Sequence, residues 1–315
     1  MRIAHVRELH APAGAPWRLA AGLGDTSSSQ WVDLEVARRR AIAGNPNLAH
    51  DSALHRQPVT TLDDHLARGF RVEALAELVD AFVPRGGPDD DDAVLEADEL
   101  RFGPPIIGPP SVRDFYAFEQ HVKTARAGRG LEVPPEWYEV PVFYFSNPAA
   151  IYGPEDEVPY PEGTQELDYE LEVAAIIGAG GQVGGFTVLN DWSARDLQRL
   201  EMKVGLGPAK GKDFATSLGP IVVTPDEFDA SEAEMVARVN GEERSRGNLR
   251  DLHWPWERLV EQAARNTRLC PGDVIGSGTV GTGCILELGD GRWLQPGDVV
   301  ELEVEGIGVL RNTVG

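Results

Sequence analysis

The sequence contains few of the features expected of a disulfide-stabilised, nucleic-acid-binding or membrane protein. Its 315 residues include only two cysteines, and neither Cys270 nor Cys284 has a second thiol or a histidine at zinc-finger spacing. We interpret both cysteines as reduced and packed. The 29 basic residues are outnumbered by 51 acidic ones, and the formal net charge of -22 argues against nucleic acid or an anionic membrane as a partner. The sequence shows neither a signal peptide nor a run of about 18 apolar residues, so we predict a cytoplasmic protein.

Hydrophobic residues are abundant enough, at 42% of the chain, to form a large core in one or two domains. Strand patterns over residues 1–36 are followed by helical spacing over residues 33–82, which predicts a small β/α N-terminal domain over residues 1–100. We interpret its last segment, PRGGPDDDD, as a solvated acidic linker. From Val140 onward short strand patterns dominate. They predict a β-rich α+β protein with a mixed β-roll or sandwich domain over residues 101–315.

Three local patterns in the second domain involve or lie next to residues that could take part in catalysis or binding. Ser111, followed three residues later by Asp114, resembles a helix start, and on such a helix Asp114 and His121 would share one face. The segment CILELG, which begins at Cys284, is typical of a strand. After His121, a basic glycine-containing loop and an aromatic run extend to about Pro148, and we interpret them as a lid over a pocket.

The segment LDYELEVAAIIG contains paired acidic residues where a buried strand would not ordinarily carry them. Glu170 and Glu172 alternate with Leu171 and Val173, so on a strand both carboxylates project from one face. Two like charges held side by side require a cation, and oxygen-only ligand sets suit Mg²⁺ and Ca²⁺. Asp191 follows the apolar run FTVL, a half-buried position where a carboxylate also needs a partner. The pattern therefore indicates a metal enzyme.

Five segments together resemble the fumarylacetoacetate hydrolase family and occur in that family's order over about the last two-thirds of the chain. They are DFYAFEQH (114–121), LDYELE (167–172), NDWSARDLQ (190–198), GKDFATS (211–217) and SGTVGTGCILEL (277–288). The resemblance implies a divalent cation, Mg²⁺ or alternatively Ca²⁺ or Mn²⁺, and a homodimer.

The same resemblance implies roles for individual residues. The implied metal ligands are Asp114, Glu170, Glu172 and Asp191, with Lys212 and Thr216 beside the metal. The implied catalytic residues are His121, Glu287 and Lys212, in which a His121–Glu287 dyad activates water. The implied substrate-binding residues are Tyr116, Arg129, Tyr144, Gln198 and Thr279. Shorter members of the family carry a glutamate three residues after the histidine, a position that Thr124 occupies here, so the carboxylate of the dyad is expected from Glu287.

These assignments predict a hydrolase that cleaves a carbon–carbon bond in a diketo acid or acylpyruvate-like substrate during the breakdown of aromatic compounds. In that reaction the metal stabilises the enolate leaving group, and Lys212, Gln198 and Arg129 offset the oxyanion charge. Met202 replaces a tyrosine of the family's namesake enzyme, which argues against fumarylacetoacetate itself as the substrate. Two alternatives remain open: a decarboxylase, isomerase or hydratase of a 2-oxo acid on the same scaffold, and a catalytically silent metal-binding protein.

Overall fold

The computed structural model describes residues 1–12, 14–24, 29–82 and 92–315, which form a sheet-rich α+β fold, as the sequence predicts. A long mixed sheet has the strand order β4-β3-β2-β1-β14-β12-β11-β17-β6-β7, with β5 added to β1 and β8 added to β14. A second sheet, β16-β15-β18-β19-β9, packs against it, and β10 pairs with β13 in a small ribbon. Within the described residues, none of the helices combines the length and the apolar character needed to cross a membrane.

In the N-terminal region, the strands over residues 2–33 precede the helices over residues 34–81, as the sequence predicts, and two short strands follow the helices. Its strands are β1 (Arg2–Glu8), β2 (Arg18–Gly22), β3 (Gln30–Asp33), β4 (Val94–Glu96) and β5 (Leu100–Phe102). Its helices are α1 (Leu34–Gly44), α2 (Leu48–Asp51), α3 (Ala53–Arg56), α4 (Leu62–Ala67) and α5 (Ala76–Ala81), with 3-10 turns at Val72–Leu75 and Ala97–Glu99. Asp33 caps α1, because its carboxylate accepts the backbone N–H groups of Glu35 and Val36, both at 3.0 Å.

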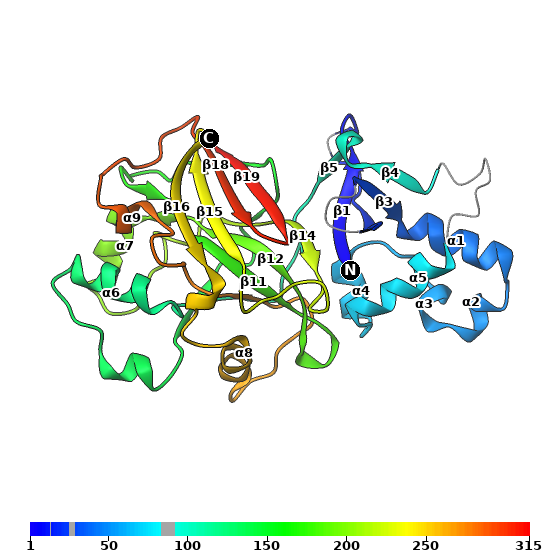
Figure 1. Ribbon diagram of the computed structural model, residues 1–315, viewed down its shortest axis with the longest axis horizontal. Coiled ribbons are helices and arrows are strands. Elements are labelled where there is room, and N and C mark those ends of the chain that lie inside the picture. Colours follow the sequence, from blue (N-terminus) through cyan, green and yellow to red (C-terminus); the bar gives the residue numbers. More distant parts are fainter. Residues whose placement is uncertain (13, 25–28, 83–91) are drawn as a thin grey trace.

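The N-terminal strands continue the same sheet that runs through the catalytic region. Arg2 and Ile3 on β1 pair with Val223 and Val222 on β14, so backbone hydrogen bonds join the two parts directly. Figure 1 shows this junction between the blue and cyan N-terminal segments and the green to red remainder. The domain boundary at residue 100 stays a prediction. Most of the predicted acidic linker, residues 83–91, lies outside the described residues.

The second region contains the remaining strands and four α-helices. The strands are β6 (Val112–Phe115), β7 (Phe143–Ser146), β8 (Ile151–Tyr152), β9 (Glu157–Val158), β10 (Leu167–Asp168), β11 (Leu171–Ile177), β12 (Val183–Asp191), β13 (Ser193–Ala194), β14 (Thr216–Val223), β15 (Glu234–Val239), β16 (Glu242–Asn248), β17 (Val274–Gly276), β18 (Val299–Val304) and β19 (Gly308–Val314). The helices are α6 (Glu119–Ala127), α7 (Arg195–Met202), α8 (Trp256–Ala264) and α9 (Ile285–Leu288), with 3-10 turns at Pro135–Tyr138, Ala179–Gly181 and Leu249–Asp251.

Strand β11 is central to the core, and every one of its residues is buried. Val173 and Ala175 pack into the core between the two sheets, whereas Ala174 and Ile176 pack into a second core under the N-terminal helices. Alternate side chains of a strand point to opposite faces, so a strand covered on both sides needs a nearly continuous apolar sequence. Glu172 is therefore a charged group within one of the most buried strands of the fold.

The predicted helix near Ser111 is wrong, because residues 112–115 form strand β6. Val112, Arg113 and Asp114 pair in parallel with residues 274–276 of β17, and Val112 and Phe115 are buried in the sheet. The Ser111 hydroxyl donates to Asp273 at 2.7 Å and caps no helix. The helix that carries His121 begins only at Glu119. Asp114 and His121 consequently lie on different elements, and the predicted shared helical face does not exist.

The predicted strand over CILELG is also wrong, because Ile285–Leu288 form the short helix α9. The Asp168 carboxylate accepts the backbone N–H groups of Ile285 at 2.7 Å and Leu286 at 3.0 Å. These are the donors that a helix start leaves without intrahelical partners. A distant residue thus provides the cap, and Gly289 ends the turn in the left-handed conformation with φ of 67°.

Candidate active site

Strand register brings four carboxylates together from the neighbouring strands β11 and β12 and from β6, which is distant from them in the sequence. Leu171 of β11 pairs with Asn190 of β12, which places Glu170 and Glu172 beside Asp191, and β17 connects β11 to β6 with Asp114. The four side chains, which we call the carboxylate cluster, are Asp114, Glu170, Glu172 and Asp191. All are buried, and one oxygen from each lies within 4.8 Å of the others. The two glutamates thus share one side of the chain, as their spacing predicts.

Gly276 provides the space in which two of these carboxylates meet. It pairs with Asp114 in the parallel register, so a side chain at position 276 would project beside that of Asp114. A Cβ atom there would lie 2.5 Å from Asp114 Oδ1 and 3.0 Å from Glu172 Oε2. Both separations are far below ordinary van der Waals contact. The cluster therefore depends on a missing side chain as well as on the carboxylates.

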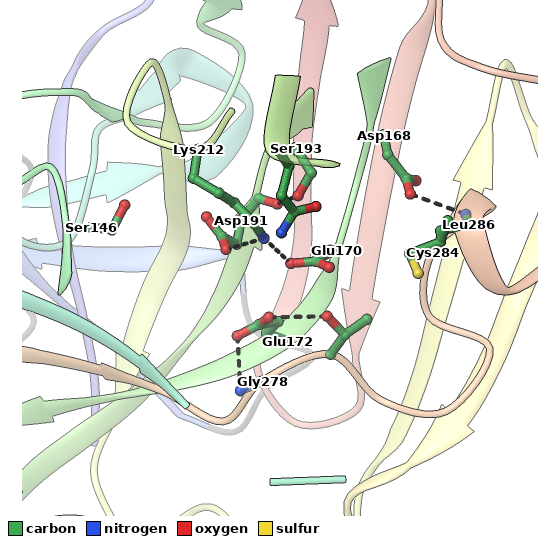
Figure 2. Close-up of polar contacts among 12 residues, drawn as sticks. Ser146, Asp168, Glu170, Glu172, Asp191, Ser193, Lys212, Gly278, Cys284 and Leu286 are labelled. Atoms are coloured by element: carbon green, nitrogen blue, oxygen red, sulfur yellow. Dashed lines mark hydrogen bonds and ion pairs between the residues drawn. The ribbon is translucent and has the colours of Figure 1, made fainter. Parts of the chain in front are cut away.

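Two buried cations neutralise part of the negative charge. The Lys212 ammonium forms ion pairs with Glu170 and with Asp191, and Figure 2 shows it between these two carboxylates. Arg195 donates to Glu170 Oε1 and to Asp168 Oδ2, both at 2.8 Å. When all groups are ionised, the carboxylate cluster and Asp168 carry five negative charges, and Lys212 and Arg195 carry two positive charges. The formal charge of these seven groups is therefore -3.

The negative charge that the two cations leave unbalanced changes the pKa values of the carboxylates in the cluster. Burial, followed by the charge of Asp191, raises the pKa of Asp114 well above its usual value, and burial with the charge of Asp114 does the same for Glu172. Burial also acts to raise the pKa of Glu170, but Arg195 and Lys212 outweigh it and hold that pKa below the usual value. In a buried cluster of like charges, the carboxyls that lack a cation retain their protons.

The cluster fits a divalent cation by its own chemistry. Asp114 Oδ1 and Asp191 Oδ1 are buried, and within the described part of the chain neither accepts a hydrogen bond. Buried carboxylate oxygens require a partner, and an oxygen-only set suits Mg²⁺, Ca²⁺ or Mn²⁺. Other groups fix the ligands in place. Gly278 N and Thr279 Oγ1 donate to Glu172 at 3.0 and 3.3 Å, and the Tyr144 hydroxyl donates to Asp191 at 2.5 Å.

His121 and Glu287 form a buried pair on the two helices α6 and α9. His121 Nδ1 lies 2.8 Å from Glu287 Oε2, and the two side chains are 5% and 1% exposed. The contact is close but is not aligned as a hydrogen bond. The ring of Tyr116 packs edge-on against the imidazole, with centroids 5.2 Å apart. Arg195 bridges Glu170 and Asp168, and Asp168 caps α9, so the pair lies next to the carboxylate cluster.

The remaining predicted site residues occupy different surroundings. Thr216 is buried, pairs with Asp191 across β14 and β12, and lies 3.2 Å from the Ser146 hydroxyl. Gln198 Oε1 accepts from Arg195 Nη1 at 3.2 Å, which places this side chain at the edge of the cluster. Arg129 is the exception. It is exposed beyond the end of α6, and its Nε donates to the Ala125 carbonyl at 3.1 Å.

Three further residues shape the site and were given no role in the sequence interpretation. Arg195 binds Glu170, Asp168 caps α9, and Cys284 Sγ donates to Glu287 Oε2 over 3.6 Å. Arg195 and Asp168 lie inside the motifs NDWSARDLQ and LDYELE. The sequence feature that could have identified them is a charged residue in an otherwise buried strand, for Asp168, and at the start of a helix, for Arg195.

Comparison with known proteins settles the family. The model of the fumarylacetoacetate (FAA) hydrolase C-terminal domain matches residues 111–315. The chain belongs to the fumarylacetoacetate hydrolase family. The matched residues include the carboxylate cluster and the His121–Glu287 pair. A relative from human, named oxaloacetate tautomerase FAHD2A, mitochondrial, is 34% identical over an alignment of 236 residues that covers 70% of this chain and 71% of the relative.

Solved structures of the family resemble the chain over its whole length. A fumarylacetoacetate hydrolase from Exiguobacterium antarcticum is 26% identical with a TM-score of 0.69, covering 100% of this chain and 99% of the other. A 5-carboxymethyl-2-hydroxymuconate delta-isomerase from Mycobacterium smegmatis is 25% identical with a TM-score of 0.64 and the same coverage. Proteins similar to this chain thus carry names of hydrolases, isomerases and tautomerases. The chain is an enzyme of this family, and a small molecule is the expected substrate.

Proposed function

We propose that the protein catalyses keto–enol interconversion of a 2-oxo acid, with His121 moving the proton at the carbon next to the carbonyl. The observation that carries this proposal is the buried contact of 2.8 Å between His121 Nδ1 and Glu287 Oε2, beside the carboxylate cluster. A histidine paired with a carboxylate is suited to general acid–base chemistry near neutral pH.

Each member of the pair has a defined task in this proposal. With the proton on Nδ1, facing Glu287, the Nε2 atom of His121 is the basic nitrogen that takes the substrate proton. The carboxylate then stabilises the imidazolium that results. A small ring rotation aligns Nδ1 with Glu287, and catalytic hydrogen bonds are often loose until the substrate binds. Tyr116 packs on the imidazole at 5.2 Å and limits its other rotations.

The carboxylate cluster has the complementary task of holding the substrate through a cation. Asp114, Glu170, Glu172 and Asp191 would hold Mg²⁺, Ca²⁺ or Mn²⁺. When bound, such an ion supplies Lewis-acid polarisation of the carbonyl and makes the neighbouring carbon more acidic. Lys212 fixes Glu170 and Asp191, and the Tyr144 hydroxyl donates to the same Asp191 oxygen that Lys212 contacts. These contacts orient the carboxylates that would act as ligands.

Carbon–carbon bond hydrolysis is the second candidate. The same pair supports it, because His121 could take a proton from water rather than from the substrate carbon. Hydrolysis also requires donors for a tetrahedral oxyanion. Of those expected from the sequence, Lys212 is shared between two carboxylates and Arg129 is exposed. Proton transfer forms no tetrahedral intermediate, and the cation itself would stabilise the enolate oxygen. A relative that is 34% identical is named an oxaloacetate tautomerase. We therefore place keto–enol interconversion first.

The test uses oxaloacetate and an acylpyruvate with added Mg²⁺. We expect faster decay of the enol absorbance of oxaloacetate and faster deuterium incorporation next to its carbonyl. Replacing His121 with alanine or Glu287 with glutamine should lower kcat by about 10²–10⁴, the usual contribution of general acid–base catalysis. Thr124→Ala is the matched control, because Thr124 is exposed on the same helix α6.

The outcomes separate the candidates. Cleavage of the acylpyruvate with solvent oxygen in the product acid, and no enol turnover, would contradict interconversion and favour hydrolysis. Metal binding without turnover of either substrate, unaffected by His121→Ala, would favour a catalytically silent metal-binding protein.

A further inference from the structure

A second group of potential ligands lies beside the carboxylate cluster and differs from it in chemistry. One atom each from His121, Cys284 and Glu287 lies within 4.8 Å of the others. The carboxylate cluster offers oxygen alone, whereas these three residues offer nitrogen, sulfur and oxygen. We propose that His121, Cys284 and Glu287 form a separate site for a thiophilic divalent cation such as Zn²⁺.

One of the separations among these ligand atoms already suits a tetrahedral ion, and another is shorter than such a site requires. Bond lengths of about 2.0–2.3 Å place neighbouring ligands of zinc roughly 3.3–3.7 Å apart. Here Cys284 Sγ lies 3.6 Å from Glu287 Oε2, and His121 Nδ1 lies 2.8 Å from the same oxygen. A modest outward movement of the imidazole would complete the geometry. Three protein ligands would leave the fourth position for water, as in open zinc sites.

A second observation points to a missing partner at the same place. Glu287 Oε1 is buried and accepts no hydrogen bond within the described residues, and the Glu287 side chain is only 1% exposed. His121 Nδ1 is also buried and makes no aligned hydrogen bond there, despite its short distance to Glu287. Buried polar atoms in this state are uncommon and call for a partner such as an ion. A cation bound to His121 Nδ1 and to both oxygens of the Glu287 carboxylate would satisfy both atoms at once.

The charge and the ligand types select the kind of ion. Binding would form a bond from Cys284 Sγ to the ion and release the thiol proton to solvent. Thiolate and carboxylate would then balance the two positive charges, which suits a site where Cys284 is fully buried. Sulfur and imidazole ligands favour zinc and cobalt, whereas the oxygen-only cluster suits magnesium. The two sites can therefore be filled independently.

Occupation of this site would inhibit the enzyme. The ion would hold His121 through Nδ1 and take Glu287 away from its role beside the imidazole. This consequence rests on the proposed function, whereas the binding itself does not.

The test is a titration of the full chain with Co²⁺ in the presence of saturating Mg²⁺. We expect a cobalt–thiolate charge-transfer absorption that reaches its limit near one equivalent and is abolished by Zn²⁺. The chain contains one other cysteine, Cys270, which gives a matched control. The absorption should persist in Cys270→Ser and vanish in Cys284→Ser. His121→Ala and Glu287→Gln each remove a direct ligand, so each should weaken cobalt binding by more than the roughly 10–100-fold that outer-shell changes cost.

The proposal is overturned if the unaltered chain shows no thiolate absorption, or if the absorption survives in Cys284→Ser. It is also overturned if His121→Ala and Glu287→Gln both bind cobalt as tightly as the unaltered chain, an outcome that decides the matter even if Cys284→Ser fails to fold. A separate measurement addresses inhibition: Zn²⁺ should slow turnover at fixed Mg²⁺, with a half-inhibitory concentration raised more than tenfold in Cys284→Ser. Cobalt binding without zinc inhibition would leave the site established and would contradict the proposed role of His121.

Discussion

The replacement of Gly276 by alanine tests whether the carboxylate cluster depends on the space beside β17. The added Cβ would lie 2.5 Å from Asp114 Oδ1 and 3.0 Å from Glu172 Oε2, so at least one carboxylate must move. The backbone of β17 is held on both sides, by β11 and by β6, and cannot easily withdraw. The added methyl group therefore acts directly on two of the four proposed metal ligands.

The change in unfolding free energy that Gly276→Ala causes has two opposing contributions. Overpacking a well-filled interior costs about 1–3 kcal/mol. Replacing glycine by alanine recovers about 0.4–1 kcal/mol by restricting the unfolded chain. The net loss of unfolding free energy is about 1–2 kcal/mol. At an unfolding entropy of about 2.1 cal/mol/K per residue, this lowers the melting temperature of the 315-residue chain by roughly 1.5–3 °C. Displacing a ligand by a few tenths of an ångström should in addition weaken metal binding by at least about tenfold, or about 1.4 kcal/mol.

The assay is Mg²⁺ binding by calorimetry together with thermal melting, with and without Mg²⁺. Asp191→Ala serves as the reference for a lost ligand and should abolish binding. Gly108→Ala serves as the steric control, because a Cβ atom at position 108 would meet nothing within 4 Å. We expect Gly108→Ala to bind Mg²⁺ normally, and Gly276→Ala to fall between the two. Unchanged affinity and melting temperature in Gly276→Ala would refute the reasoning, since the strands would then have adjusted to the methyl group.

Two further predictions concern the N-terminal region. Asp33→Ala should lower the unfolding free energy by about 1–2 kcal/mol, because Asp33 caps α1 and pairs with Arg18 at 3.2 Å. Asn47→Ala is the control and should be nearly neutral, because the Asn47 side chain makes no capping hydrogen bond. Urea denaturation measures both variants. Stability should also fall as the pH drops below about 6.5, because burial lowers the pKa of His5 in the folded state and the unfolded chain then takes up the proton first. His5→Gln should flatten this dependence in urea titrations from pH 7.5 to 5.5, unlike His10→Gln at an exposed position, and equal slopes in both variants would contradict the role of His5.

The sequence by itself determined the family, the order of strands and helices in most of the chain, and the paired glutamates. These features are local. A strand with alternating Glu170 and Glu172 must direct both carboxylates to one side, and a strand covered on both faces must be apolar elsewhere. The motifs that carried the family resemblance contain every member of the carboxylate cluster.

Only the tertiary structure decided how Asp114, Glu287 and the cations enter the site. Residues 112–115 form a strand because β17 pairs with them, although Ser111 and Asp114 locally resemble a helix start. Residues 285–288 form a helix because Asp168, more than a hundred positions earlier, caps it. Arg195 supplies a buried guanidinium to the cluster through its contact with Glu170. Each outcome depends on backbone and side-chain partners that are far away in the chain, and local propensity does not record them.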